Sequence, residues 1–411
     1  MCNELEILEG WDERILYDLA EYHNGAAFKP KDWVEDGLPI VRIEQINKPN
    51  SETDKFNGFV LPRNLIDTGD LIFSWSATLK VIIWSGGPAV LNQHLYKVVP
   101  NSGVNKQLLL QILDFNMEKL AGQSQGSTMK HVTRKELTKF RVKFPLNENE
   151  QEKIAIILRT VDEAIEKTEA LIDKYGLVKA GMMHDLLTRG LTPGGKLRPP
   201  REEAPDLYKE TPIGWIPKEW EFKTIDECAN IHNNLRLPLS SEVREGMRGD
   251  YPYYGPTGIV GFINEFRADG TYVLIGEDGD HFLKYSYKKM TQKVVGKFNV
   301  NNHAHVLSGK DGCSTDWLLY YFLHRDITFW LTRQGAGRYK LNKAALQKLP
   351  LALPKPEEQD EIAKHIFFYR NMLDTNGAVL AKLRKQKKGL MHDLLTGEVQ
   401  VKVNDPEAAH V

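Results

Sequence analysis

The sequence predicts an α/β fold: two globular domains of mixed α/β structure, separated by two long antiparallel coiled-coil helices and related by pseudo-two-fold symmetry. Three observations predict it. The 411 residues contain a tandem repeat, each copy of the repeat carries an apolar heptad pattern with no interior proline, and short β-rich runs fill the intervening blocks. A length of 411 residues also accommodates two or three domains of ~100–200 residues each.

The repeat is the strongest of these observations. Residues 150–188 align without gaps to residues 358–396, with 14 of 39 positions identical, and both copies contain the run MHDLLT. Trp11 and Trp220 occupy equivalent places near the start of each half. The blocks between these landmarks do not resemble each other. The sequence therefore indicates two related modules that share the repeated block, while their variable blocks differ and suggest different specificities.

Each repeated block is predicted to form one long helix. The predicted helix-pair seam consists of Ile154, Leu158, Val161, Ile165 and Ile172 in the first copy and of Ile362, Ile366, Tyr369, Leu373 and Leu380 in the second. Polar residues interrupt the seam at matching places, Thr168 with Asn376 and Lys179 with Lys387. Polar seam residues set the register of a coiled coil at a cost in stability. Two alternatives stay open: the helices pair with each other, or each packs on its own domain.

The variable blocks are predicted to contain many short strands and few helices. The β-rich runs are Pro39–Ile46, Asp70–Trp75, Val81–Trp84, Leu95–Val99, Thr271–Ile275 and Lys293–Val300. Helices are expected at Asn105–Leu120 and Thr315–Leu331, and a proline-rich linker at Leu191–Pro217 is expected to be extended and exposed. The predicted boundaries divide the chain into the first variable block (1–148), the first long helix (149–190), the linker (191–217), the second variable block (218–353), the second long helix (354–396) and a C-terminal tail (397–411).

Composition limits the class of protein. Three scattered cysteines are too few for a disulfide scaffold, which suits a reducing compartment and predicts a cytoplasmic location. The acidic N-terminal sequence has no signal-peptide pattern, and no apolar run approaches the ~20 residues of a membrane helix. With 54 Lys+Arg against 55 Asp+Glu, the chain as a whole is no polycation.

Motifs for catalysis are absent from the sequence. It contains no GxxxxGK[ST], no GxGxxG after a strand, no Asn/Asp-Pro-Pro-aromatic run and no HExxH. His303 and His305 could share a strand face, but no carboxylates cluster beside them in the sequence, so no metal site is expected. Glu277, Asp278 and Asp280 could chelate Mg²⁺ for a nuclease, although a polar loop after a strand is the simpler interpretation. No catalytic residue is assigned.

Basic residues gather in strips that the net charge conceals. Two strips, Lys130–Lys143 and Ile327–Lys348, occupy equivalent places just before each predicted long helix, and a third covers Lys284–Lys297. Lys, Arg, hydroxyl and backbone N–H groups are what DNA phosphates attract. The candidate phosphate-binding residues are Ser127, Thr128, Lys130, His131, Arg134, Lys135, Lys284, Lys288, Lys289, Arg333, Arg338, Tyr339, Lys340 and Lys343.

Base edges are read by polar side chains on loops that reach a groove. Such residues occur in both variable blocks. In the first block the candidates are Arg42, Gln45, Ser74, Ser76, Asn92, Gln93, His94, Gln123 and Gln125. In the second block they are Tyr253, Tyr254, Thr257, Asn301, Asn302, His303 and Gln334.

The chain resembles the specificity (S) subunit of type I restriction–modification systems over essentially its whole length. The resemblance is carried by the helix entries FPLNENEQEKIA and LPKPEEQDEIA, the helix ends KAGMMHDLLTRG and KKGLMHDLLTGEV, and the runs GSTMKHVTRKEL, GDYPYYGPTGIVGFI and VLIGEDGD. The sequence departs from a regular helix at Gly377, where the first copy has Glu169; a glycine there is expected to weaken or bend the second helix.

The resemblance implies a sequence-specific DNA-binding subunit that is not itself an enzyme. Each variable block would be a target recognition domain that reads one half of a bipartite target, and the helices would set the gap and dock two methyltransferase (M) subunits. Motor/nuclease (R) subunits would join them. The resemblance implies no cofactor on this chain, with S-adenosylmethionine, ATP and Mg²⁺ used by the partner subunits in adenine N6-methylation and cleavage.

Three other functions stay open. One is the specificity component of a related restriction system whose partner fuses nuclease and methyltransferase. The others are a Mg²⁺-dependent nuclease and a scaffold that binds only proteins. If the S-subunit interpretation holds, a 39-residue helix of ~58 Å would separate the half-sites by roughly 17 base pairs at ~3.4 Å each.

Overall fold

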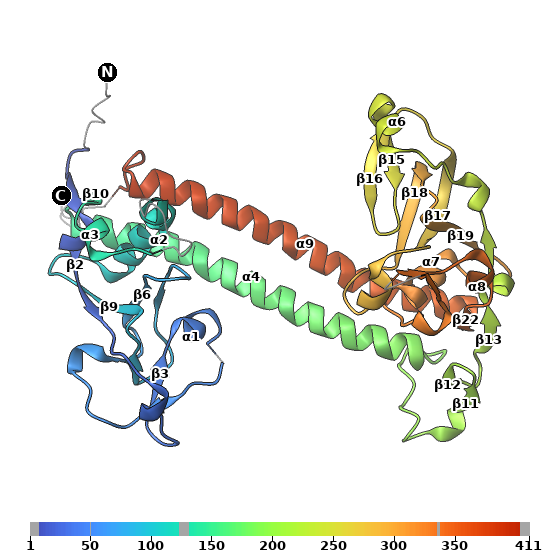
Figure 1. Ribbon diagram of the computed structural model, residues 1–411, viewed down its shortest axis with the longest axis horizontal. Coiled ribbons are helices and arrows are strands. Elements are labelled where there is room, and N and C mark those ends of the chain that lie inside the picture. Colours follow the sequence, from blue (N-terminus) through green and yellow to red (C-terminus); the bar gives the residue numbers. More distant parts are fainter. Residues whose placement is uncertain (1–7, 50, 123–130, 335–337, 403–411) are drawn as a thin grey trace, which may run out of the picture. The chain divides into compact units, whose positions relative to one another are not determined.

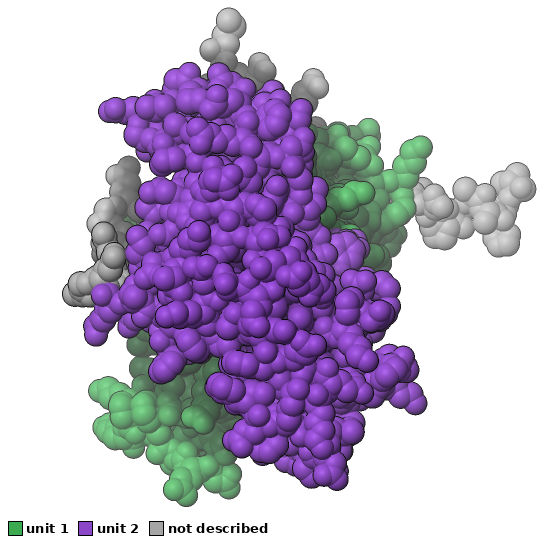
Figure 2. Space-filling view, turned by 90° about the vertical axis from the view of Figure 1, so that its right-hand side faces the viewer, with its two compact units in different colours: residues 1–171, 377–411 green, residues 172–376 purple. Residues whose placement is uncertain are grey.

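The computed structural model describes residues 8–49, 51–122, 131–334 and 338–402. The chain divides into two compact units, which Figure 2 shows in different colours. Unit 1 comprises residues 1–171 and 377–411, and unit 2 comprises residues 172–376. Each unit therefore contains one variable block and a part of both long helices.

Unit 1 is built from short strands around an apolar core. Its strands are β1 (Trp11–Ile15), β2 (Ala20–Asn24), β3 (Leu38–Val41), β4 (Lys55–Phe56), β5 (Leu65–Ile66), β6 (Leu71–Ser74), β7 (Lys80–Ile83), β8 (Ala89–Leu91), β9 (Leu95–Pro100) and β10 (Arg141–Pro145). Its short helices are α1 (Ile43–Asn47), α2 (Lys106–Gly122) and α3 (Arg134–Leu137). Within the described residues the strands form sheets of order β2-β9-β6-β7 and β4-β3-β8-β5 and an antiparallel ribbon of β1 with β10.

Unit 2 contains a larger mixed sheet of order β14-β19-β17-β18-β15-β16, in which only β15 and β18 run parallel. Its strands are β11 (Tyr208–Thr211), β12 (Gly214–Pro217), β13 (Glu221–Thr224), β14 (Ala229–Ile231), β15 (Arg248–Tyr254), β16 (Ile259–Ile263), β17 (Ala268–Gly276), β18 (Thr291–Val300), β19 (Ala304–Gly309), β20 (Thr332–Gln334), β21 (Arg338–Lys340) and β22 (Pro350–Leu353). Its short helices are α5 (Ile225–Cys228), α6 (Ser241–Gly246), α7 (Thr315–Phe322) and α8 (Lys343–Gln347). Ribbons of β13 with β22, β11 with β12 and β20 with β21 complete the unit.

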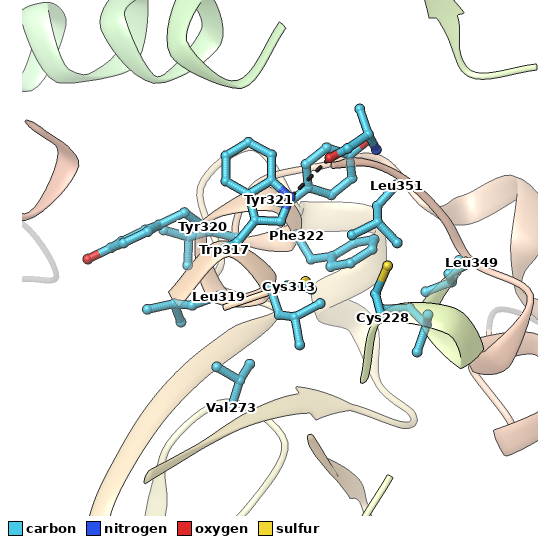
Figure 3. Packing of buried hydrophobic residues seen from close by; sticks show 14 of the residues in the cluster. Cys228, Val273, Cys313, Trp317, Leu319, Tyr320, Tyr321, Phe322, Leu349 and Leu351 are labelled. Carbon is cyan, nitrogen blue, oxygen red and sulfur yellow. Dashed lines mark hydrogen bonds between the residues drawn. The ribbon is translucent and has the colours of Figure 1, made fainter. Parts of the chain in front are cut away.

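The core of unit 2 is rich in aromatic residues contributed by α7 (Figure 3). Ser314 caps this helix by accepting a hydrogen bond from the backbone of Trp317 at 3.0 Å. The Trp317 ring packs edge-on against Trp220, and its Nε1 donates to the carbonyl of Ala352 at 3.0 Å. Buried indole N–H groups need such a partner. The aromatic helix therefore joins the sheet to the ribbon that leads into the second long helix.

The two longest helices in Figure 1 are α4 (Glu148–Thr188) and α9 (Pro356–Leu395), and they coincide with the repeated blocks of the sequence. In unit 1 the start of α4 and the end of α9 share one core, which contains Ile154, Leu158 and Met391. In unit 2 the end of α4 and the start of α9 share another, which contains Leu186 and Ile366.

Within unit 1 the two helices run antiparallel, as predicted. Asp162 of α4 pairs with Lys387 of α9, and Glu169, further along α4, pairs with Arg384, which lies earlier in α9. All ten predicted seam residues are buried or half-buried. Both alternatives for the helices therefore hold in part, because the helix ends pack on the domain cores and also on each other. Thr168 and Asn376 each bond a carbonyl of their own helix, four residues earlier.

A tryptophan–glutamate hydrogen bond recurs in both units. Trp11 Nε1 donates to Oε1 of Glu150 at 3.1 Å, and Trp220 Nε1 donates to Oε1 of Glu358 at 3.0 Å. Each glutamate lies at the start of a long helix, where its negative charge interacts favourably with the N-terminal end of the helix dipole. The matching positions of these residues in the repeat thus correspond to matching contacts in space.

The glutamine that follows each glutamate is buried and makes three hydrogen bonds. Nε2 of Gln359 donates to the carbonyls of Gly312 and Pro354, both at 2.8 Å, while its Oε1 accepts from Ser314 N at 2.8 Å. Gln151 makes the same three contacts in unit 1, with the partners Gly103, Pro145 and Asn105. These amides fasten the start of each long helix to the globular part of its unit.

Two sequence expectations were wrong in detail. Pro39–Ile46 is a strand only as far as Val41, because Gln45 folds back to accept a hydrogen bond from the backbone of Arg42 and starts helix α1. Helix α7 ends at Phe322, and Asp326 then bonds the backbone of Thr328 to start a new turn. The periodicity of apolar residues in the sequence does not reveal such hydrogen bonds from side chains to the backbone.

The proline-rich segment 191–217 is folded, not extended and exposed. It contains the ribbon of β11 and β12, and the side chains of Leu191, Arg198, Tyr208 and Ile216 are buried. Gly377, expected to weaken or bend the second helix, lies inside a continuous α9. None of the described helices is long and apolar enough to span a bilayer.

Candidate DNA-binding interface

In unit 1 the structure gathers several predicted DNA contacts around one tryptophan. The Trp75 ring lies 5.9 Å from the ring of His94 and 6.1 Å from that of His131, centroid to centroid. Gln93, next to His94, is exposed, and so is Arg134, whose guanidinium donates to the carbonyl of Tyr22 at 2.9 Å. This Trp75 cluster combines groups suited to bases with groups suited to phosphates.

Sequence reasoning missed Trp75 itself. The residue lies between Ser74 and Ser76, two of the candidates, at the end of a β-rich run. An aromatic residue between two polar ones at a strand end is a signal that could have found it. Ser76 is buried and forms a β-bridge to His131, which brings this residue of the first basic strip next to the segment that follows β6.

Other candidates in unit 1 have structural roles instead. The Gln45 side chain is buried and donates to Ser51 Oγ and to the carbonyl of Glu52. Ser74 is buried and donates to the carbonyl of Thr78 at 2.6 Å. Because their polar atoms are already bonded inside the fold, we withdraw both as base-reading residues.

Arg42 and Asn92 are also held inside unit 1. The guanidinium of Arg42 pairs with Asp54 and lies 5.3 Å from the ring centroid of Trp33. Asn92 is buried, and its Oδ1 accepts a hydrogen bond from the backbone of His94 at 3.4 Å. Asn92 therefore orients the turn that presents Gln93 and His94.

In unit 2 the predicted base-reading residues of two turns meet at one end of the large sheet. The backbone N–H of Asn301, after β18, donates to the carbonyl of Tyr254, at the end of β15, at 2.9 Å. Asn301 Oδ1 accepts from the backbone of His303 at 2.9 Å, which shapes the turn into β19. Asn302 and His303 are exposed in this turn. The ribbon of β20 and β21 joins the same end, because Asp278 forms a β-bridge to Lys340.

The structure corrects the prediction that Tyr253 reads bases. Its ring is buried, and its hydroxyl donates to the carbonyl of Leu237 at 2.6 Å while it accepts from the backbone of Leu239. Burial raises the pKa of this phenol, so it stays protonated and keeps donating. Tyr254 is half-buried and packs edge-on against Phe298 at 6.0 Å. Of the two tyrosines, Tyr253 is a core residue.

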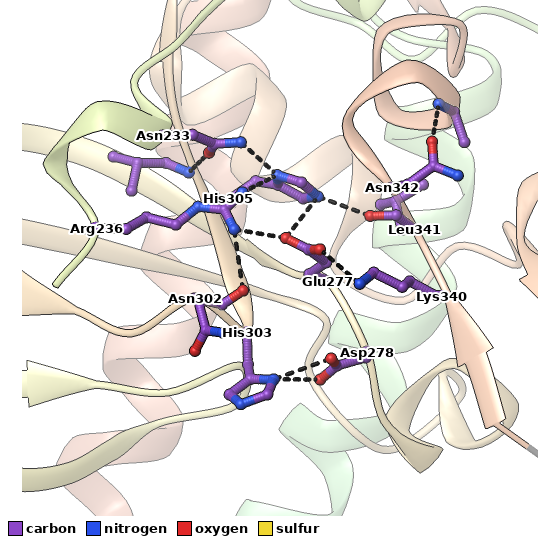
Figure 4. Close-up of polar contacts among 12 residues, drawn as sticks. Asn233, Arg236, Glu277, Asp278, Asn302, His303, His305, Lys340, Leu341 and Asn342 are labelled. Atoms are coloured by element: carbon purple, nitrogen blue, oxygen red, sulfur yellow. Dashed lines mark hydrogen bonds and ion pairs between the residues drawn. The ribbon is translucent and has the colours of Figure 1, made fainter. Parts of the chain in front are cut away.

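The three carboxylates that suggested a nuclease each have different partners, and Figure 4 shows two of them, Glu277 and Asp278. Glu277 pairs with Arg236 at 2.6 Å, and Asp278 with Nδ1 of His303 at 2.9 Å. Asp280 pairs with Lys284 and Lys288, which lower its pKa to about 2. Each carboxylate thus has its own cationic or imidazole partner. Within the described residues no three His, Cys, Asp or Glu side chains are placed to hold a metal ion. Nothing in this arrangement favours nuclease chemistry.

The phosphate candidates of unit 2 differ in how free they are. Lys284 and Lys288 share Asp280, and Lys340 lies 3.2 Å from Glu277. Tyr339 is half-buried beside the core. Lys289, Arg333 and Lys343 of unit 2 are exposed, and their binding to phosphates remains a prediction. Two further exposed candidates also remain predictions: Lys135 of unit 1 for phosphates and Thr257 of unit 2 for base edges.

For seven candidates the structure describes no side chain. Gln123, Gln125, Ser127, Thr128 and Lys130 lie outside the described residues. For Gln334 and Arg338 the structure describes the backbone, which pairs across the β20–β21 ribbon, and not the side chains.

Comparisons with known proteins agree with this architecture. The family model "Type I restriction modification DNA specificity domain" matches residues 8–174 and again residues 217–385. The type I restriction enzyme MjaVIII specificity subunit of Methanocaldococcus jannaschii is 22% identical over 97% of this chain and 95% of its own length. The EcoBI specificity subunit of Escherichia coli is 24% identical over 96% and 87%. A proposed specificity subunit of Haemophilus influenzae is 40% identical over 147 residues, which is 36% of each chain.

Solved structures share the fold. The S subunit of a type I restriction–modification system from M. genitalium superimposes with a TM-score of 0.65 at 15% identity, over 96% of this chain and 98% of that one. A chain from a study of complex assembly and conformational transition in a type I system gives 0.52, also at 15% identity, over 96% and 100%. The family match covers most of the chain in two copies, one for each half of the repeat. The chain therefore belongs to the type I restriction modification DNA specificity family and carries the specificity domain twice.

Proposed function

We propose that this chain is the sequence-reading subunit of a type I restriction–modification complex, in which unit 1 reads one half of a bipartite DNA target and unit 2 reads the other. The observation that carries the proposal is that the two units share the contacts at the start of their long helices but differ in their exposed polar surfaces. The Trp–Glu and Gln contacts are the same in both units, whereas the Trp75 cluster and the turn at Asn302–His303 have no counterpart in each other. A shared frame with different recognition surfaces is what two different half-sites require.

The chemistry of the reaction belongs to partner subunits in this proposal. Two M subunits dock along α4 and α9, bind S-adenosylmethionine and methylate one adenine in each half-site after flipping it from the duplex. R subunits, with ATP and Mg²⁺, add cleavage of unmodified DNA. This chain supplies hydrogen bonds to base edges and phosphates and holds no cofactor of its own.

The test is methylation mapping. The chain is expressed with its M subunit in cells that lack other adenine methylation, and the genome is read by long-read sequencing. We expect one methylated motif made of two short specific halves with a fixed gap. The purified chain alone, incubated with Mg²⁺ and DNA, should neither cut nor methylate. A continuous motif, or activity of the isolated chain, would refute the proposal.

The gap provides a second test of the same proposal. Seven residues inserted after Glu166 in α4 and after the equivalent Asp374 in α9 lengthen each helix by ~10 Å. At ~3.4 Å per base pair, the gap should grow by about three base pairs while both halves stay the same. An unchanged gap would show that α4 and α9 do not set the spacing.

A further inference from the structure

Unit 2 contains a buried ionic network centred on Glu277, directly after strand β17 (Figure 4). Its carboxylate lies 2.6 Å from Arg236 Nη1, 3.2 Å from Lys340 Nζ and 3.6 Å from His305 Nε2. The side chains of Glu277, Arg236 and His305 are only 12%, 15% and 1% exposed. Because these three side chains are largely buried, their contacts with neighbouring segments indicate what the network does.

The backbone of Glu277 joins the same neighbours. Its N–H donates to the carbonyl of His303 at 2.8 Å, and its carbonyl accepts from Leu341 N at 2.7 Å. Glu277 therefore fastens two segments to the end of β17: the exposed turn Asn301–His303 and the end of the β20–β21 ribbon. Both segments carry predicted DNA contacts.

His305 completes the network. Its Nδ1 lies 2.9 Å from Asn233 Nδ2 and 2.9 Å from Arg236 Nη2, both of which are donors, so Nδ1 accepts. Its Nε2 must then carry the proton and donate to the carbonyl of Leu341 at 2.7 Å. Burial lowers the pKa of His305, which keeps the ring neutral and this direction of hydrogen bonds fixed. The neutral imidazole thus links Arg236 to the ribbon.

Removing the negative charge at Glu277 would change the network without removing its atoms. Arg236 and Lys340 would then face each other with no carboxylate between them, and one of the two would have to move towards solvent. Lys340 is the more exposed, and it belongs to the ribbon. The first consequence of losing the charge is therefore a looser β20–β21 ribbon.

We infer that Glu277, with Arg236 and His305, is a positioning residue for base reading by unit 2: it holds the Asn301–His303 turn and the β20–β21 ribbon in the geometry that discriminates one half of the target. This inference rests on the proposed function. It reassigns Lys340 from phosphate binding to this network. It also assigns a role to the carboxylate at position 277, which lies within the acidic cluster that first suggested a nuclease.

The experiment compares E277Q with D280N in the full chain, each co-expressed with the M subunit. Both substitutions remove one carboxylate charge, but Asp280 is exposed and, among the described residues, pairs with Lys284 and Lys288. In E277Q we expect discrimination against single mismatches to fall about tenfold in the half-site read by unit 2, and to stay the same in the other half. Hydrogen exchange should accelerate in peptides covering Tyr339–Ala345. D280N should match the wild type, and both variants should bind M normally.

Unchanged stringency of E277Q in both halves, or an equal loss in both, would overturn the inference. If E277Q does not fold, R236K carries the same test, because lysine keeps the charge but cannot bridge Glu277 and His305 together. Failure of the proposed function is a different result: the wild-type chain with M would then yield no bipartite motif.

Discussion

The same lysine of the repeat has opposite electrostatic surroundings in the two units. In unit 1, Lys387 of α9 lies 2.8 Å from Asp162 and 3.1 Å from Asp114. Burial alone would lower its pKa, but the two carboxylates outweigh burial and raise it. In unit 2 the equivalent residue is Lys179 of α4, whose pKa is lowered by burial and by the nearby cations Arg370 and Lys289.

The repeat alignment explains the difference. Arg370 occupies the position of Asp162, so an attractive pair in unit 1 corresponds to a repulsive one in unit 2. The two equivalent glutamates differ in their partners, and here the unit 2 residue has the additional cationic one. Glu150 bonds Trp11, whereas Glu358 bonds Trp220, the backbone of Leu191 and the buried Arg198. The two halves of the repeat therefore share the Trp–Glu hydrogen bond, while the charged groups around their helices differ.

The largest effect should come from the feature that both units share. Replacing Gln151 or Gln359 with Leu leaves two carbonyls and one N–H without partners, at ~1–3 kcal/mol for each buried group. We expect each variant to lose about 3 kcal/mol or more of unfolding free energy. Hydrogen exchange followed by mass spectrometry should locate the loss in unit 1 for Q151L and in unit 2 for Q359L. The exposed Gln386 on α9 provides the control Q386L. A loss below 1 kcal/mol would contradict the role given to these amides.

The next effect should be confined to unit 2. Arg198 contacts Glu358 at 2.5 and 3.0 Å and Glu219 at 2.7 Å, and its side chain is 5% exposed. R198M leaves Glu358 buried beside fewer donors, which should destabilise unit 2 by about 3 kcal/mol in urea unfolding. R198M/E358Q should recover most of the loss, because the unpaired charge is gone. Equal losses in the single and double variants would indicate that packing, not charge, is responsible.

A smaller effect should separate the two lysines. Met keeps the aliphatic length of Lys, so K387M removes mainly the charge that neutralises Asp162 and should cost about 1 kcal/mol. K179M removes a cation beside Arg370 and should leave stability unchanged or slightly improved. Thermal unfolding of the two variants side by side measures the difference. If both substitutions destabilise equally, the contrast between the units has no energetic consequence.

The smallest effect concerns pH. Because the folded-state pKa of His305 is lowered, the unfolded chain binds a proton near its ordinary pKa of ~6.5 while the folded one does not. Unfolding free energy from this group is therefore fully present above pH ~6.5 and falls as the pH drops below it. An NMR titration of histidine-labelled protein should place His305 below 6.5, and lower still in E277Q, which lacks a carboxylate that raises it. A midpoint above 6.5 would contradict the neutral ring.

Sequence alone predicted the frame well, because the frame repeats. The helices Glu148–Thr188 and Pro356–Leu395 lie close to the predicted 149–190 and 354–396, since heptads and a duplicated MHDLLT run are local signals. The recognition surfaces were predicted less well. Burial of Gln45, Ser74 and Tyr253 depends on contacts that no local pattern encodes.

Networks between distant segments were the least predictable feature. Arg236, Glu277 and His305 meet because the end of β17 lies beside the start of β19, and the segment after β14 reaches the same place. A histidine inside the apolar strand run AHVL was a usable signal, since a buried imidazole needs partners. Its partners could not be named without the sheet order.

The most direct test of the central claim is a domain exchange followed by methylation mapping. Residues 218–353 are replaced by the corresponding block of another family member with a different target, and the chimera is expressed with the M subunit. The account predicts that one half of the motif changes to that of the donor, while the other half and the gap stay as in the wild type. A motif that changes in both halves, or in neither, would contradict the claim that each unit reads one half.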